Sequence, residues 1–222
     1  MYNMLPNSAE FLPRNVPVWG LECDLRQPTT RMMSMFDFST ELMALLRDPD
    51  LMQPSNLVMN ADSPLSMYIP PDGRLGETLT GTRYKEMYAG LSDPKNQLLC
   101  PLIFFTDGTL FTTKSNREMI PVLFTLAIFN VKARQQRKLW RLLGYIPDPG
   151  LHMSSRQKSQ AGYGKGKGYA VRNFHRCMDV MLSGLKAFQD GDDPRAKGVH
   201  LKLMDHWVTV DLKVPILLII QD

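Results

Sequence analysis

The longest apolar runs of the chain lie after residue 97 and are separated by polar turns. Residues 98–105 (LLCPLIFF) end at the turn sequence TDGT, residues 121–129 (PVLFTLAIF) follow, and residues 139–146 (LWRLLGYI) stop at PDP. Apolar runs of this length, rich in aromatic and branched side chains and bounded by turns, are typical of buried strands. The short links between them predict an antiparallel three-stranded meander whose first member is central.

A helical period follows the meander. Between residues 169 and 189, apolar residues recur at steps of three and four, which predicts one helix with a single apolar face. Apolar and polar residues alternate in residues 199–204 and again in residues 207–212, which predicts a hairpin of two strands. Residues 215–220 (PILLII) predict a last buried strand that carries Asp222 at its tip.

This order of elements predicts an α/β (α+β) fold with an RNase H-like core, in which a helix crosses over from the three-stranded meander to a fourth, parallel strand. Other α+β folds share the same order. The first half is different, because residues 1–97 are cut into short pieces by many prolines. We expect residues 1–97 to form an irregular, proline-rich lead-in with short helices, and residues 98–222 to form a truncated, incomplete RNase H-like catalytic core.

Two short helices are predicted inside this lead-in. The first spans residues 39–47, where Ser39 or Asp37 can cap the helix and the leucines form an apolar stripe. The second lies within residues 76–90.

The composition limits the class of protein. Hydrophobic residues make up 44% of the 222 residues and charged residues 22%, as in ordinary globular proteins. No apolar run approaches the roughly 18 residues that a membrane helix needs, and the first residues do not resemble a secretory signal. The three cysteines are scattered and the four histidines lack metal-ligand spacing, so neither a disulfide framework nor a zinc site is expected. A reducing compartment follows from this cysteine usage.

The positive charge is concentrated in one part of the chain. Residues 114–176 contain 13 lysines and arginines against two acidic residues, a local balance of +11 within a net charge of +4, so the remainder is at −7. Such asymmetry predicts a face that contacts nucleic acid, and a solvated basic surface without a partner is the alternative. The predicted nucleic-acid-binding residues are Lys132, Arg134, Arg137, Lys138, Arg141, Lys165 and Lys167.

Trp140 and the two lysines of a glycine-rich stretch need a separate interpretation. Trp140 can stack on a base or pack in the core, and packing is the favoured interpretation. Lys165 and Lys167 lie in the glycine-rich stretch GYGKGKGY, which does not contain the P-loop pattern and so gives no indication of ATP binding.

Two carboxylates are placed where a metal-dependent nuclease needs them. Asp107 follows the first predicted strand, and Asp222 ends the last one. If these strands are neighbours, both side chains point into one pocket and can hold the divalent cations that phosphodiester chemistry uses. The alternatives are that Asp107 belongs to an ordinary Asp-Gly turn and that Asp222 is simply solvated.

Several segments resemble a known family. Residues 101–110 (PLIFFTDGTL), 119–130 (MIPVLFTLAIFN) and 139–147 (LWRLLGYIP) are similar, in this order, to the core of Plavaka-type transposases of the CACTA (En/Spm) superfamily. Residues 56–60 and 80–84 resemble the lead-in of that family, and residues 214–222 resemble the strand that ends in its second acidic residue. The resemblance spans residues 40 to 222.

The resemblance implies a DDE/D transposase, which is a nuclease that cuts and joins DNA with Mg²⁺ or Mn²⁺. Asp107 and Asp222 then correspond to the first and second catalytic, metal-binding acids. Gly108 stands where the family often has lysine. The resemblance places the third acid on a helix beyond Asp222. We therefore expect this chain to be a fragment or remnant of a cut-and-paste transposase. Whether it is an enzyme stays open.

The resemblance also sets expectations for partners and location. It implies binding to DNA, both transposon ends and target, residence in the nucleus or otherwise the cytoplasm, and no membrane. We expect apolar surface near residues 214–220 to favour self-association, for example as a homo-oligomer. The alternative functions are a domesticated, non-catalytic nucleic-acid-binding or interaction protein, and a general α/β domain without this ancestry.

Overall fold

The computed structural model describes residues 12–24, 27–70, 78–106, 109–112, 117–146 and 169–221. Its strands are β1 (Arg14–Asp24), β2 (Gln27–Met35), β3 (Gln97–Leu99), β4 (Leu102–Thr106), β5 (Thr109–Thr112), β6 (Arg117–Leu126), β7 (Arg141–Ile146), β8 (Val199–Leu203), β9 (His206–Lys213) and β10 (Ile216–Gln221). The α-helices are α1 (Phe38–Arg47), α2 (Thr82–Ala89), α3 (Val131–Arg134), α5 (Tyr169–Met181) and α6 (Ser183–Asp190). Short 3-10 turns are η2 (Pro54–Asn56), η3 (Thr78–Thr80), η4 (Arg137–Leu139) and η5 (Pro194–Ala196).

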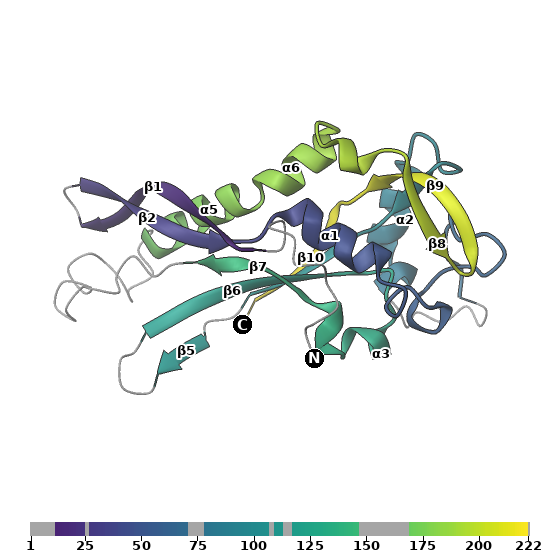
Figure 1. Ribbon diagram of the computed structural model, residues 1–222, viewed down its shortest axis with the longest axis horizontal. Coiled ribbons are helices and arrows are strands. Elements are labelled where there is room, and N and C mark those ends of the chain that lie inside the picture. Colours follow the sequence, from purple (N-terminus) through teal and green to yellow (C-terminus); the bar gives the residue numbers. More distant parts are fainter. Residues whose placement is uncertain are drawn as a thin grey trace.

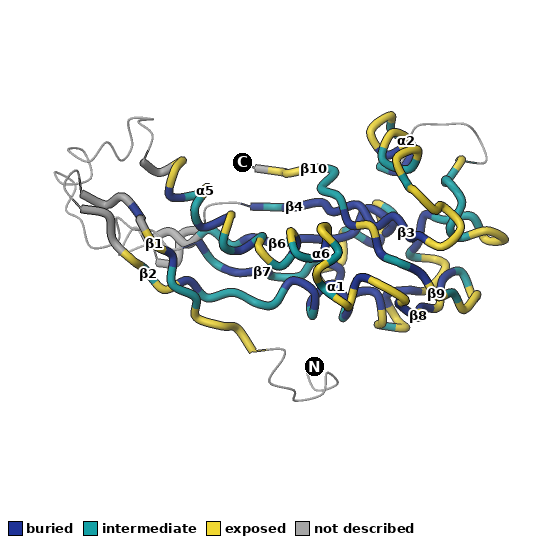
Figure 2. Tube along the Cα trace, turned by 90° about the horizontal axis from the view of Figure 1, so that it is seen from above, coloured by how far each residue is buried: buried dark blue, intermediate teal, exposed yellow. Residues whose placement is uncertain are grey.

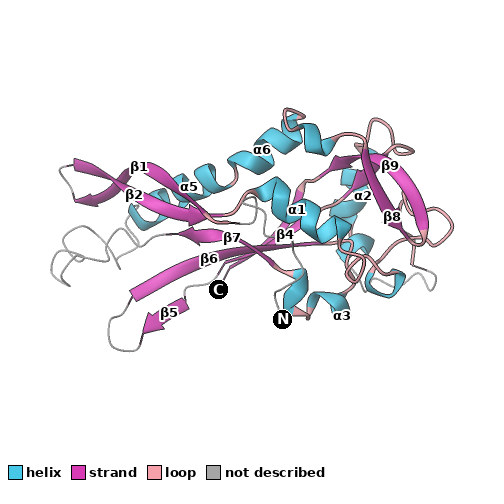
Figure 3. Ribbon diagram, in the orientation of Figure 1, coloured by secondary structure: helices cyan, strands magenta, loops and turns pink. Residues whose placement is uncertain are grey.

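The protein has a mixed α+β architecture built on two sheets (Figure 3). The main sheet has the order β1-β2-β7-β6-β4-β10, with β5 paired to β6, and the smaller sheet has the order β3-β9-β8. Strands β4, β6 and β7 form the predicted antiparallel meander, and β10 runs parallel to β4. Helices α1, α5 and α6 lie over one face of the main sheet (Figure 1). The predicted meander, hairpin and parallel last strand are therefore confirmed. The last strand is not buried as predicted, because it is an outer strand of the main sheet and Leu218, Ile219 and Ile220 are exposed.

The first predicted strand is in fact two strands that belong to different sheets. Residues 97–99 pair with β9, and residues 102–106 pair with β6 and β10. Pro101 lies between them and has no N–H to donate to a strand neighbour. Around it, the Cys100 amide donates to the Lys213 carbonyl at 2.7 Å and the Leu102 amide donates to the Pro215 carbonyl at 2.8 Å. The prediction of one continuous strand was wrong because a proline lets the chain pass from one sheet to the other.

The predicted helix over residues 169–189 is also divided. Helix α5 ends at Met181 and α6 begins at Ser183, with Leu182 at φ −88° and ψ 2° between them. Helix α5 packs on β1 and β7, whereas α6 packs on α1. One apolar stripe thus serves two differently oriented partners, and the helix bends where the partner changes.

Two strands lie in the segment for which the sequence predicted only an irregular lead-in. Strands β1 and β2 form an antiparallel hairpin with bulges, and β2 joins the main sheet where Met35 pairs with Gly144 of β7. Pro17 is tolerated in β1 because β1 is the outer strand of this sheet. The predicted helices of this half are confirmed as α1 and α2.

An aromatic cluster joins the helical layer to the main sheet. Phe38 of α1 packs against Phe124 of β6 at a ring-centroid distance of 5.3 Å and against Phe188 of α6 at 6.1 Å. Phe104 of β4 lies 6.1 Å from Phe124. All four rings are fully buried. Strand β4 is coloured as buried over most of its length in Figure 2, so the strand that precedes Asp107 is anchored in the core. Burial of an aromatic side chain of this kind contributes roughly 1.5–3 kcal/mol.

Hydrogen bonds donated by Arg195 fix the start of α1. Asp37 caps the helix by accepting from the Thr40 amide at 2.8 Å, and the Arg195 guanidinium donates to Asp37 and to Asp193, each at 2.8 Å. The buried Ser39 hydroxyl donates to Asp193 at 2.6 Å. The hydrogen bonds from Arg195 lower the pKa of Asp193 to about 2. Burial would raise the pKa of Asp37, but hydrogen bonds from Thr40 and Arg195 outweigh it and the pKa is lowered.

We expect Arg195→Ala to lower the free energy of unfolding by about 1 kcal/mol, after allowance for the partial exposure of the guanidinium. Because the pKa of Asp193 is depressed, its stabilisation is present above its ordinary value of 3.8 and is lost as the pH falls towards 2. Urea unfolding at pH 6 and at pH 2.5 measures both effects, and the difference between variant and wild type should shrink at pH 2.5. Arg83→Ala, which removes an exposed ion pair with Glu86, is the control and should change stability by less than about 0.5 kcal/mol.

Gly144 of β7 sits where β2, β7 and α5 meet. A Cβ atom at this position would lie 2.8 Å from the Ser34 carbonyl oxygen and 3.0 Å from side-chain atoms of Met35 and Met181. We expect Gly144→Ala to destabilise the protein by about 1–3 kcal/mol through overpacking, measured by urea unfolding. Gly90→Ala is the matched control, because Gly90 has an ordinary φ of −82° and a Cβ there would make only contacts of 3.5 Å or longer. Equal stability of Gly144→Ala and Gly90→Ala would contradict the close approach.

Candidate functional site

The carboxyl ends of β4 and β10 lie side by side. Thr106, the last residue of β4, is the register partner of Gln221, the last residue of β10, in a parallel pair. Asp107 and Asp222 are the next residues in the sequence, and both lie outside the described residues. The two strands that the metal-site hypothesis required to be neighbours are therefore neighbours, and they end at the same register position.

The protein holds this edge of the sheet rigidly on the β4 side. Thr106 is only 1% exposed and pairs with Val122 of β6, which is fully buried. The adjacent Phe104 belongs to the aromatic cluster described above. A buried, paired strand restricts the backbone at its last residue. A binding site that must hold its ligands in a fixed geometry is therefore well placed directly after such a strand.

The described residues contain no group of three or more histidine, cysteine or acidic side chains that could hold a metal ion. The described thiols are buried: burial raises the pKa of Cys177 to about 11 and that of Cys100 further, which makes both poor nucleophiles. The described part of the chain thus offers no competing metal or thiol site.

The predicted nucleic-acid-binding residues of the segment 132–138 lie at the other end of the main sheet. Leu126, where β6 ends, pairs with Leu102, where β4 begins, and α3 and η4 follow directly (Figure 1). Lys132, Arg137 and Lys138 are exposed there. The length of β4 therefore separates this basic segment from the end that carries Asp107.

Arg134 and Arg141 make contacts inside the protein. The Arg134 guanidinium donates to the carbonyl oxygens of Ala127 and Phe129 and, at 2.9 Å, to the Thr78 hydroxyl. Nε of Arg141 lies 3.9 Å from a carboxylate oxygen of Glu41 in α1, and both side chains are largely buried. Burial raises the pKa of Glu41, and the nearby Arg141 partly offsets this. Lys165 and Lys167 lie outside the described residues.

Trp140 packs against neighbouring side chains. Its indole N–H donates to the Arg134 carbonyl oxygen at 2.7 Å, and its ring meets that of Phe105 edge-on at a centroid distance of 6.2 Å. The side chain is half-buried. The packing interpretation of Trp140 is confirmed.

Sequence reasoning missed a groove between α1 and the β8–β9 hairpin. The groove has a volume of about 440 Å³, and Trp207, which is 65% exposed, forms part of its wall. The Trp207 indole is stacked on the His200 imidazole with a centroid distance of 4.8 Å and an interplanar angle of 5°. The alternation of apolar and polar residues along the hairpin could have predicted this exposed ring pair. It places His200 and Trp207 on the face opposite the buried residues Val199 and Leu201.

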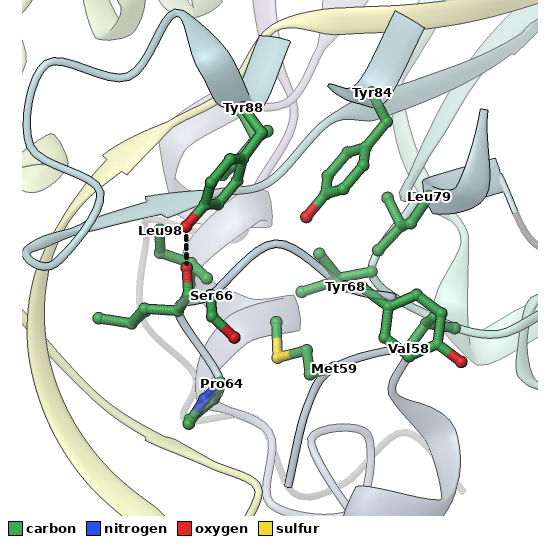
Figure 4. Close-up of a pocket in the computed structure, with 12 residues that line it drawn as sticks. Val58, Met59, Pro64, Ser66, Tyr68, Leu79, Tyr84, Tyr88 and Leu98 are labelled. Atoms are coloured by element: carbon green, nitrogen blue, oxygen red, sulfur yellow. Dashed lines mark hydrogen bonds between the residues drawn. The ribbon is translucent and has the colours of Figure 1, made fainter. Parts of the chain in front are cut away.

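A second cavity lies beneath α2 and is only about 10 Å³ in volume (Figure 4). The hydroxyl of Tyr88 donates to the Leu65 carbonyl oxygen at 3.2 Å. Tyr84 points its hydroxyl into the same space, and burial raises its pKa to about 12. A cavity of this size holds about one water molecule, so these tyrosines join α2 to the preceding loop and do not form a ligand site.

The fold and the paired strand ends define a mixed α+β protein with one rigid sheet edge at which two chain segments converge. The family model for the Plavaka transposase matches residues 34–204. This match covers well over half of the chain, and the chain belongs to that family. It includes the β4–β6–β7 meander and ends before β9 and β10. No curated protein and no solved structure matches the chain. In the part of the chain that the structure describes, no helix is long and apolar enough to cross a membrane.

Proposed function

We propose that this chain is a fragment or remnant of a cut-and-paste DNA transposase whose site for metal-dependent strand cleavage includes Asp107 and Asp222. The observation that carries the proposal is the parallel register of Thr106 with Gln221, the residues directly before the two acids. Membership of the Plavaka transposase family supports action on DNA. The meander, the helices and the parallel strand beside β4 support an RNase H-like arrangement.

The proposed ligands fit a hard divalent cation. Neighbouring strands lie about 4.8 Å apart, so carboxylates that follow paired positions are close enough to share a cation. Mg²⁺ and Mn²⁺ prefer carboxylate oxygens, and such ions, when bound, stabilise the charge that develops during phosphodiester cleavage. Asp107 and Asp222 would bind and orient the ion, while the buried strand β4 limits their movement. A third acid beyond Asp222 would complete the set that the family uses.

A second candidate function is non-catalytic nucleic-acid binding. The exposed Lys132, Arg137 and Lys138 favour it, because they lie away from the acid-bearing strand ends and do not depend on a metal site. A domesticated protein that had lost the chemistry would keep this basic segment. For either candidate we propose a nuclear location, where the DNA partner is found.

We also propose self-association. Strand β10 is an outer strand of the main sheet, and Leu218, Ile219 and Ile220 are 46%, 52% and 41% exposed. Consecutive exposed apolar residues on an outer strand promote pairing with another chain.

Metal-titration calorimetry tests the proposed acids. We expect Mg²⁺ or Mn²⁺ to give binding heat with the wild type, and we expect this heat to disappear in Asp107→Asn and in Asp222→Asn because each change removes an anionic ligand. Asp205→Asn, at an exposed turn of the small sheet, is the control and should keep the heat. The absence of heat in the wild type would exclude the metal site in this chain and leave the non-catalytic function.

The salt dependence of duplex DNA binding tests the basic segment. We expect simultaneous replacement of Lys132, Arg137 and Lys138 by alanine to reduce the slope of log K against log salt by about 2–3, since each lost phosphate contact changes this slope by about 0.9. The control replaces Lys85, Lys95 and Lys186, which are exposed elsewhere, and makes the same change in net charge. Equal slopes for the two triple variants would contradict a specific role for the segment 132–138.

A further inference from the structure

An exposed aromatic stack lies on the outer face of the β8–β9 hairpin. Trp207 is 65% exposed although the opposite face of the hairpin buries Val199, Leu201 and Leu203. The His200 ring is parallel to the indole within 5° at a centroid distance of 4.8 Å, so it covers one face of Trp207 and fixes its plane. The two rings together form an exposed, flat aromatic platform outside the buried core.

This platform borders a groove of the size that small ligands occupy. The groove measures about 440 Å³, and its walls include Met52 and Pro54 as well as Trp207. Binding pockets for small molecules commonly measure 300–1,000 Å³, that is, a volume on the order of one nucleotide or more. A flat ring is the shape that a parallel aromatic platform accepts.

Among the described charged residues at the rim of the groove, Arg47 differs from Lys202 in its contacts. The Asp48 carboxylate accepts from the backbone amides of Asp50 and Leu51, and the Asp205 carboxylate pairs with Lys202 at 2.9 Å. Arg47 is exposed and has no ion pair with a described acidic residue. An exposed guanidinium suits an anionic group such as a phosphate.

The groove is joined to the basic segment 132–138. Pro54, in its wall, begins η2, and Asn130 holds η2 by donating to the Ser55 carbonyl oxygen at 2.8 Å from its side chain and to the Asn56 carbonyl oxygen at 2.8 Å from its backbone. The same Asn130 caps α3, where the basic segment begins. Residues 131–141 contain no acidic residue. η2 thus links the wall of the groove to the start of the basic segment, and the register of β4 with β6 places that segment at the end of the main sheet where β4 begins.

We propose that this groove binds an unpaired base of single-stranded DNA, with the base stacked on the free face of Trp207 and the adjoining phosphates directed to Arg47 and the segment 132–138. A base can reach the platform only when it is not stacked in a duplex, which makes the site selective for single strands. Aromatic grooves also accept proline-rich peptides, but such a peptide offers no charge to Arg47 or to the basic segment. The proposal does not depend on Asp107, Asp222 or any metal.

Fluorescence anisotropy with a labelled oligothymidylate of ten nucleotides tests the proposal on the full chain, in buffer with EDTA. Trp207→Ala should weaken binding roughly tenfold, as expected for the loss of one base stacked on an aromatic ring. Trp207→Phe should retain most of the affinity, because a ring remains. Trp19→Ala is the matched control, since Trp19 is 71% exposed in β1, and it should bind as the wild type does. Urea unfolding of each variant confirms that it is folded.

The remaining measurements separate this proposal from its rivals. A blunt duplex of the same length should lose no affinity in Trp207→Ala; an equal loss would overturn selectivity for an unpaired base. If Trp207→Ala and the wild type bound the single strand with equal affinity, the proposed site would be wrong. It would also be wrong if the protein bound decaproline through Trp207 but did not bind oligothymidylate. Asp107→Asn should keep full affinity for the single strand, so failure of the metal site and failure of this groove are told apart.

Discussion

The parallel pairing of β10 with β4 is the constraint on which the remaining arrangement depends. Strand β4 is anchored through Phe104 and Phe124 to the aromatic cluster, and β10 can lie beside it only after the chain has crossed the sheet through α5 and α6. A parallel connection of this kind needs a long crossover, which here also supplies the helical cover of the main sheet. The register that results aligns Thr106 with Gln221, the residues that precede the two acids.

The two ends of the main sheet carry different groups of residues. At one end of the main sheet, β4 and β10 end directly before Asp107 and Asp222. At the other end lie α3, η4 and the neighbouring groove that Trp207 lines. An antiparallel meander produces this separation, because the turn between β6 and β7 must lie at the end where β4 begins.

Several arginines form hydrogen bonds or ion pairs inside the protein that could not be predicted from their positions in the sequence. Arg134 satisfies backbone carbonyls after β6, Arg141 faces Glu41, and Arg195 fixes the cap of α1. Guanidinium groups suit such positions because they donate several hydrogen bonds in a fixed plane and stay charged when partly buried. The lysines of the segment, Lys132 and Lys138, remain exposed. The density of basic residues along the sequence therefore locates the basic segment 132–138. Only the contacts in the structure show which of its side chains are exposed.

The sequence by itself determined the elements whose pattern is local. The meander, the β8–β9 hairpin, α1 with its Asp37 cap, α2 and the last strand follow from apolar period, capping and turn residues. The tertiary structure alone decided the break at Pro101, the bend at Leu182 and the β1–β2 hairpin, because each depends on which distant element is the partner. It also decided that β10 lies beside β4 and that Trp207 is left exposed over a groove. A period along the chain states which face of an element is apolar, whereas only the assembled chain determines what that face meets.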